Sequence, residues 1–193
     1  MPRCIALFRA VNVGGRFIKM EALRAEFEAR MSANVTTSTA SGNVIFESRA
    51  RNLVAFARKI EAHLRARFGF GIHTFIRADD ELSAVAAHEA FDPAESAVAK
   101  AHVVGLVARP LDAAAAQALG PFQHPANRFH VGKRTRCWRS TNGQDEATVS
   151  NAAFERALRT RACLSQHHYV AQTGRQVGLP LNPCEAIERP RGH

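Results

Sequence analysis

The sequence lacks the features that mark membrane, secreted and disulfide-stabilised chains. No run of 18 apolar residues occurs in its 193 residues, so no membrane-spanning helix is expected. The four cysteines are widely spaced and form no Cys-x-x-Cys pair, which argues against a zinc ribbon and against a disulfide framework. Arg3 is followed by no long apolar stretch of the kind that precedes a signal cleavage site. We therefore expect a cytoplasmic protein without membrane contact.

Several sequence motifs of catalysis and cofactor binding are also missing. There is no Walker loop, no third glycine to complete a dinucleotide fingerprint, and no Gly-x-Ser-x-Gly elbow. The nine histidines are scattered apart from His167-His168, so we predict neither a metal site nor a cofactor. Cys163 and His167 have a helix-compatible spacing, but a buried structural thiol is the favoured interpretation of Cys163. No catalytic residue can be named, and the sequence leaves open whether the protein is an enzyme.

The composition is basic and rich enough in apolar residues to form a sizeable core. Lysine and arginine number 26 against 17 acidic residues, which gives a net charge of +9, and 46% of the residues are hydrophobic. Such a charge is compatible with a phosphate-bearing partner. Because the arginines are scattered along the chain, an ordinary solvated basic surface is the favoured alternative.

The hydrophobic pattern of the first half alternates between strand and helix. Apolar or β-prone runs predict strands over residues 4–8, 35–40, 44–46 and 72–76. Apolar stripes at three- and four-residue steps predict helices over 20–31 and 53–68, the second capped by Asn52 and ended by Gly69 and Gly71. The resulting order, β-α-β-β-α-β, is a split βαβ unit.

The second half repeats much of this order. Helices are predicted over residues 79–88, 111–119 and 151–158, with a strand over 103–107 and a hairpin over 128–139; a closing strand is not evident. The prediction is therefore an α+β fold of two ferredoxin-like (split βαβ) subdomains of similar topology, over residues 1–78 and 79–172, with an irregular C-terminal tail over 173–193. The predicted core comprises Leu7, Leu23, Phe27, Ile45, Phe56, Ile60, Leu64, Val104 and Phe154.

Polar turns follow the first two strands of the first half. In a split βαβ unit these strands run parallel, so their carboxyl ends lie at one edge of the sheet. Glycine allows close backbone approach there, asparagine offers a donor and an acceptor, and arginine offers a fork suited to phosphate or carboxylate. Turns bonded only to each other are the open alternative. The predicted ligand-binding residues are Arg9, Asn12, Gly14, Gly15, Lys19, Ser41, Gly42 and Asn43.

Aromatic residues of the second hairpin raise a separate possibility. Phe129 and Trp138 could stack nucleic-acid bases on a sheet surface. Packing in the core is the favoured alternative for both rings.

The stretches Arg9-Ala10-Val11-Asn12-Val13-Gly14-Gly15 and Ser41-Gly42-Asn43-Val44-Ile45-Phe46, with Lys19-Met20 and Leu23-Arg24 between them, resemble the domain-of-unknown-function family 1697. The resemblance is specific in the first fifty residues and extends to about residue 172. It implies two α+β subdomains of similar topology and no established activity. This chain departs from the family pattern at Ala10, at Ala40 and over residues 163–168.

Two functions remain open from the sequence. The first is a binding module for an anionic ligand, which could be a nucleotide, a nucleic acid or a metabolite bearing phosphate or carboxylate. The alternative is a small cytoplasmic enzyme whose inter-subdomain cleft holds such a substrate, with Arg9 and Lys19 neutralising its charge. The sequence does not define an oligomeric state.

Overall fold

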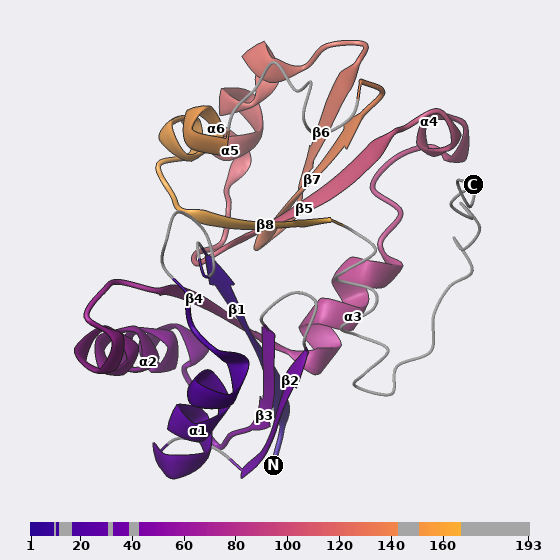
Figure 1. Ribbon diagram of the computed structural model, residues 1–193. Helices are drawn as coiled ribbons and strands as arrows, with labels where there is room; N and C mark the ends of the chain where they lie inside the picture. The colour runs from indigo at the N-terminus through magenta and orange to yellow at the C-terminus, as the bar shows by residue number, and fades with distance from the viewer. Residues whose placement is uncertain (10, 12–16, 31–32, 39–42, 143–150, 167–193) are drawn as a thin grey trace, which may run out of the picture.

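Five consecutive apolar residues form the middle of the first strand, β1 (Arg3–Arg9), and all five are buried. The computed structural model of the protein describes residues 1–9, 11, 17–30, 33–38, 43–142 and 151–166 (Figure 1). β1 lies in a four-stranded sheet of order β2-β3-β1-β4, whose other strands are β2 (Ala33–Ser38), β3 (Asn43–Glu47) and β4 (His73–Ala78). Every adjacent pair is antiparallel, so β1 and β2, which both oppose β3, run parallel to each other.

A second sheet repeats this topology. Its strands are β5 (Ala101–Val107), β6 (Asn127–Val131), β7 (Thr135–Ser140) and β8 (Ala162–Gln166), in the order β6-β7-β5-β8. In chain order these strands occupy the same places as β1 to β4, and all their pairings are antiparallel. The expected α+β fold of two split βαβ subdomains is therefore confirmed.

The helices connect these strands. The first subdomain, as named here, is the first sheet with α1 (Met20–Arg30) and α2 (Leu53–Phe68). The second subdomain is the second sheet with α5 (Ala113–Ala118), the 3-10 helix η1 (Gly120–Phe122) and α6 (Asn151–Leu158). Two further helices, α3 (Asp79–Ala87) and α4 (Pro93–Ala97), lie between the two subdomains in the chain.

Successive residues of β1 point to opposite faces of the first sheet, and both faces are covered. Cys4, Ala6 and Phe8 pack against apolar residues of α1 and α2. Ile5 and Leu7 belong to another cluster, which contains Val104 and Leu106 of the second sheet, together with Ile45, Phe75, Leu82, Cys137 and Cys163. The inner faces of the two sheets therefore bury each other. A third cluster lies between the second sheet and α6, and it includes Trp138 and Phe154 (Figure 1).

The ends of α2 are fixed by the residues that the sequence indicates. The Asn52 side chain accepts a hydrogen bond from the Ala55 amide at 2.9 Å, which satisfies a free donor of the first turn. Gly69 ends the helix in the left-handed conformation, with φ of +79°, and its amide donates to the Arg65 carbonyl. Both termini match the prediction.

A buried arginine joins the two subdomains. Arg77, at the end of β4, is fully buried and donates from Nη2 to the carbonyls of Val107 at 2.6 Å and of Arg134 at 3.2 Å. Its Nε lies 3.1 Å from Glu81 Oε1, and the other oxygen of Glu81 accepts from Arg134 at 3.0 Å. Burial lowers the pKa of Arg77 to about 10, with Arg134 acting in the same direction and Glu81 in the opposite one. The guanidinium therefore remains charged at neutral pH.

The structure corrects several expectations. The second subdomain has a closing strand, β8, which the sequence pattern did not reveal. Because Cys163 lies in this strand, the helical spacing considered for Cys163 and His167 does not apply. α5 begins at Ala113, because Asp112 caps it by accepting from the Ala115 amide. Phe56 is only half-buried, whereas the other predicted core residues are buried.

Phe129 and Trp138 stack on each other in the core, so neither ring forms a base-stacking platform. The tail from residue 173 lies outside the described residues.

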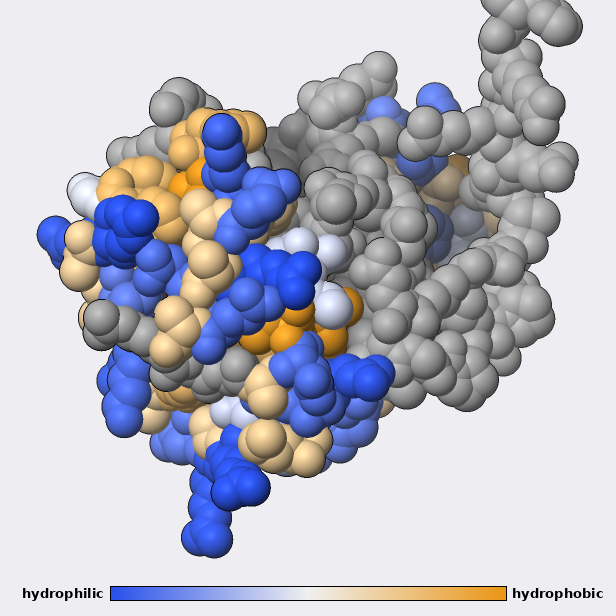
Figure 2. Space-filling model, turned by 60° about the horizontal axis from the view of Figure 1, so that its bottom comes forward, coloured by the Kyte–Doolittle hydropathy of each residue, from blue (hydrophilic) through white to orange (hydrophobic). Residues whose placement is uncertain are grey.

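The described surface carries few large apolar side chains. Met1, Phe17 and Val98 are the large hydrophobic residues exposed in the described ranges. On the face shown in Figure 2, strongly hydrophilic residues alternate with weakly hydrophobic ones, and strongly hydrophobic areas are small. Among the described residues, no helix combines the length and apolar character needed to cross a bilayer.

Candidate functional site

Three of the predicted ligand-binding residues lie in the described part of the chain. Arg9 ends β1 opposite His73, and Asn43 begins β3 opposite Ser38. Because β1 and β2 run parallel, these ends occupy the same edge of the first sheet. Asn43 is buried at 4% exposure, whereas Lys19 is exposed immediately before α1. Asn12, Gly14, Gly15, Ser41 and Gly42 lie outside the described residues, so their clustering stays a prediction.

Arg9 already has an acidic partner in the second subdomain. Its Nη1 lies 2.7 Å from Oε1 of Glu155 on α6, and the same oxygen accepts from the Ala162 amide at 2.9 Å. The carboxyl end of β1 is thus tied to both α6 and β8. Sequence reasoning missed Glu155 because nothing local in the chain indicates a partner so far from Arg9.

An open hollow of about 490 Å³ lies beside this ion pair, and half of its lining residues are arginines. Its lining residues are Ala152, Glu155, Arg156, Arg159, Thr160 and Arg161. All three arginine residues are exposed. Arg159 has φ of +48°, which ends α6 and turns the chain toward β8. The single carboxylate of the lining is the one that pairs with Arg9, so the arginines supply an excess of positive charge.

His73 of the first subdomain contacts Arg161, one of the arginines that line the hollow. Arg161 Nη1 lies 2.6 Å from His73 Nε2 and 3.1 Å from Nδ1. His73 Nδ1 lies 3.7 Å from Glu61 Oε1, which accepts from the Thr74 amide at 2.8 Å. Since arginine can only donate, the imidazole must present its acceptor nitrogen to Arg161. The first subdomain therefore orients one of the arginines that line the hollow.

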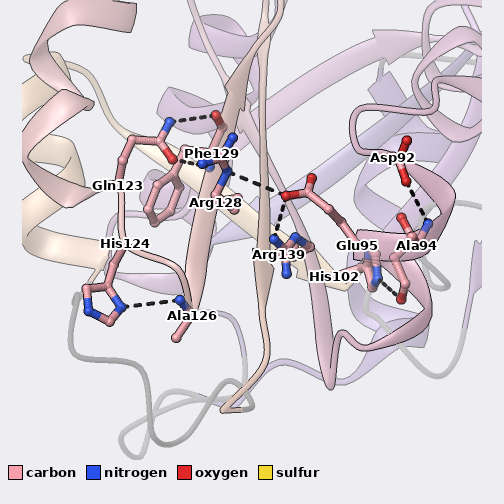
Figure 3. Close-up of polar contacts among 11 residues, drawn as sticks. Asp92, Ala94, Glu95, His102, Gln123, His124, Ala126, Arg128, Phe129 and Arg139 are labelled. Atoms are coloured by element: carbon pink, nitrogen blue, oxygen red, sulfur yellow. Dashed lines mark hydrogen bonds and ion pairs between the residues drawn. The ribbon is translucent and has the colours of Figure 1, made fainter.

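A second hollow, of about 470 Å³, lies between α4 and β6. It is lined by Glu89, Ala90, Phe91, Asp92, Glu95, Arg128, Phe129 and His130. Glu95 reaches from α4 toward the sheet, 2.9 Å from Arg139 and 3.8 Å from Arg128 (Figure 3). Asp92 caps α4 by accepting from the Ala94 amide at 2.8 Å (Figure 3). With cations and carboxylates facing each other, this hollow is less suited to an anion than the one beside Arg9.

The cysteines provide no activated nucleophile in the described structure. Burial raises the pKa of Cys4, Cys137 and Cys163 to about 11. The thiolate is the reactive form, so these side chains act as buried apolar groups at neutral pH. Within the described ranges, no group of three histidine, cysteine or acidic side chains is arranged to hold a metal ion.

Comparisons with known proteins agree with the fold. A structure of a conserved bacterial protein from Streptococcus pneumoniae aligns with a TM-score of 0.70 and 18% identity, over 93% of this chain and 99% of that chain. No curated protein matches the sequence. The family model described as protein of unknown function (DUF1697) matches residues 1–136. Since this match spans more than half of the sequence, the chain belongs to the DUF1697 family.

Proposed function

We propose that the protein binds a small ligand bearing phosphate or carboxylate in the hollow beside the Arg9–Glu155 ion pair. The proposal rests on the side chains that line the hollow. Three exposed arginines and a threonine line it, and its one carboxylate, Glu155, is already neutralised by Arg9. Planar guanidinium groups match phosphate and carboxylate oxygens bidentately. The hollow is wide open to solvent, so the guanidinium groups can meet an anionic group of a ligand directly from the surface.

The predicted turn residues extend the same proposal. Asn12, Gly14 and Gly15 closely follow Arg9 in the chain, and Arg9 is held beside the hollow by Glu155. We therefore propose that these residues, with Ser41 and Gly42, supply amide donors to the same ligand. We favour binding over catalysis because the side chains that line the hollow are arginines, a threonine and an already paired glutamate.

Calorimetric titration with inorganic phosphate and with phenyl phosphate tests this function. The double variant Arg156→Ala/Arg159→Ala should weaken phosphate binding at least about tenfold, because each lost charge-assisted contact contributes roughly 1.5–3 kcal/mol. The matched control is Arg58→Ala/Arg65→Ala, which removes two exposed arginines from α2. Equal binding by wild type and by the Arg156/Arg159 variant would contradict the proposal.

A further inference from the structure

The solvent face of α2 carries charge of one sign only. Ala57, Ile60 and Leu64 are its buried residues. The opposite face, together with Arg51 two residues before the helix, exposes a run of cations and alanines that we call the α2 stripe: Arg51, Ala55, Arg58, Lys59, Ala62 and Arg65. The one acidic residue of the helix, Glu61, is half-buried and accepts from the Thr74 amide on β4. The stripe is therefore uniformly basic.

The four cations of the stripe form no ion pair with any described residue. Neighbouring arginines differ in this respect. Arg67 of the same helix lies 2.7 Å from Glu26, and Arg24 of α1 lies 2.7 Å from Glu28. Ion pairs thus neutralise Arg67 and Arg24, whereas the stripe cations have no such pair within the described part of the chain.

Helix stability does not account for these positions. Cations near the carboxyl end of a helix interact favourably with its dipole, which explains Arg65. Arg51 lies just before the amino end, where a positive charge is unfavourable and where α2 has no acidic residue in its first turn, and Arg58 lies too far from either end to gain from the dipole. A partner that supplies negative charge would compensate for this arrangement.

The spacing of the stripe gives it the form of a straight ridge. Arg58 and Arg65 are seven helical residues apart, so they lie about 10 Å from each other along one face of α2, while Arg51 precedes the helix. Ala62 lies between them and lets another surface approach closely. A rod with regularly spaced anionic groups matches such a ridge.

We propose that the α2 stripe binds the phosphate backbone of a double-stranded nucleic acid without reading its sequence. The stripe offers four cations and no asparagine or glutamine, so the proposed contacts are electrostatic and made to phosphate oxygens. A single strand is disfavoured because the stripe has no aromatic residue on which bases could stack, and Phe129 and Trp138 are buried. The net charge of +9 adds long-range attraction. α2 covers the first sheet, whereas the hollow lies at α6 (Figure 1), so this surface is separate from the ligand site.

Fluorescence anisotropy with labelled DNA and RNA duplexes of about 20 base pairs tests the proposal across roughly 50 to 200 mM salt. Four phosphate contacts predict a slope of log K against log salt of about −3 to −4, equal for unrelated sequences. Arg58→Ala/Arg65→Ala should make the slope shallower by about 2. The matched control, Arg156→Ala/Arg159→Ala, removes the same charge from the hollow and should leave the slope unchanged.

Four outcomes would overturn the inference: no duplex binding, an unchanged slope in the Arg58/Arg65 variant, equal weakening by both double variants, or preference for one duplex sequence.

Binding to vesicles containing phosphatidylserine distinguishes a lipid surface from a nucleic acid as the partner. Vesicle binding that depends on Arg58 and Arg65, without duplex binding, would replace nucleic acid by membrane as the partner. Circular dichroism and thermal melting of each variant verify that the fold is retained. Phosphate titrations of the same proteins report on the hollow independently.

Discussion

Arg136 is a buried cation enclosed by an aromatic ring and a strand backbone. Its guanidinium carbon lies 3.9 Å from the centre of the Phe154 ring, and its side-chain nitrogens have no hydrogen-bond partner among the described residues. Burial lowers its pKa to about 10, while Glu155 opposes this shift. The ring therefore provides the close favourable contact for the charge.

Gly105 provides the space for this arginine, and its replacement by alanine should destabilise the protein. An added Cβ would lie 3.1 Å from Arg136 Nε, 3.2 Å from Nη2 and 3.2 Å from Leu164 Cδ2. Gly105→Ala should lower the free energy of unfolding by about 1–3 kcal/mol, measured by urea denaturation. Gly120→Ala is the control, since a Cβ there meets nothing within 4 Å. Similar losses in both variants would show that Gly105 has no special steric role.

The buried thiols should be unreactive in the native protein. With pKa values of about 11, Cys4, Cys137 and Cys163 are thiolate in roughly one molecule per thousand at pH 8, and burial blocks access further. In a Cys184→Ser background, Ellman's reagent should react at least about a hundredfold more slowly with native than with urea-unfolded protein. Rapid labelling of any one of the three native thiols would refute this.

At the scale of elements, α1 and α2 are held together by a shared carboxylate. Glu26 of α1 accepts from Arg67 Nε at 2.7 Å and lies 2.8 Å from His63 Nε2, both on α2. These hydrogen bonds, first from His63 and then from Arg67, lower the pKa of Glu26. A polar clamp thus supplements the apolar contact of the two helices with the sheet.

The clamp should make part of the stability dependent on pH. Because the folded pKa of Glu26 is lowered, its contribution is fully present above the unfolded value of about 4.3 and is lost as the pH falls through the lower folded value. Glu26→Gln should therefore be less stable than wild type at neutral pH, and the difference should shrink below about pH 4. Thermal melting across pH measures it. A difference independent of pH would exclude the carboxylate as its source.

Elements with strong local signals could be predicted from sequence, and others could not. α2 has an apolar stripe, an asparagine cap and a terminating glycine, and its predicted bounds coincide with the observed ones. β8 was missed because it is a short strand with two polar residues, and its partner among the described strands is β5, far away in the chain. α4 was not predicted either, because a helix of five residues is too short to show an apolar stripe. At the site, Arg9 was identified, but its pairing with Glu155 depends on packing between the subdomains, and the arginines of the hollow lie at the end of α6 in no recognisable motif.

At the scale of the whole molecule, the apolar interface between the two subdomains is joined by a polar link, the hydrogen bonds of the buried Arg77 side chain. Arg77 provides donors to backbone carbonyls on both sides of this interface, including Ile76 in its own strand at 2.9 Å. The carbonyl of Val107 ends β5, which corresponds to β1 in the first sheet. The charge network therefore fixes the relative position of the two sheets.

Loss of this link should destabilise the molecule strongly. Arg77→Met keeps much of the side-chain volume but leaves the carbonyls of Val107 and Arg134 without this donor, so the free energy of unfolding should fall by about 2–4 kcal/mol. Arg24→Met, which breaks an exposed ion pair on α1, should lose only about 0.5 kcal/mol. Urea denaturation compares the two variants. Equal losses would mean that Arg77 adds no more than a surface pair.

Synthesis on the ribosome exposes the interface of the sheets before it can form. β4 ends at Ala78, whereas β8 begins only at Ala162. Until β5 and β7 have been synthesised, Ile5, Leu7 and Phe75 lack Val104, Leu106 and Cys137, which pack in the same cluster in the native protein. Such a surface binds chaperones and promotes aggregation of nascent chains. We therefore expect the yield of native protein to depend on how fast the second half is translated.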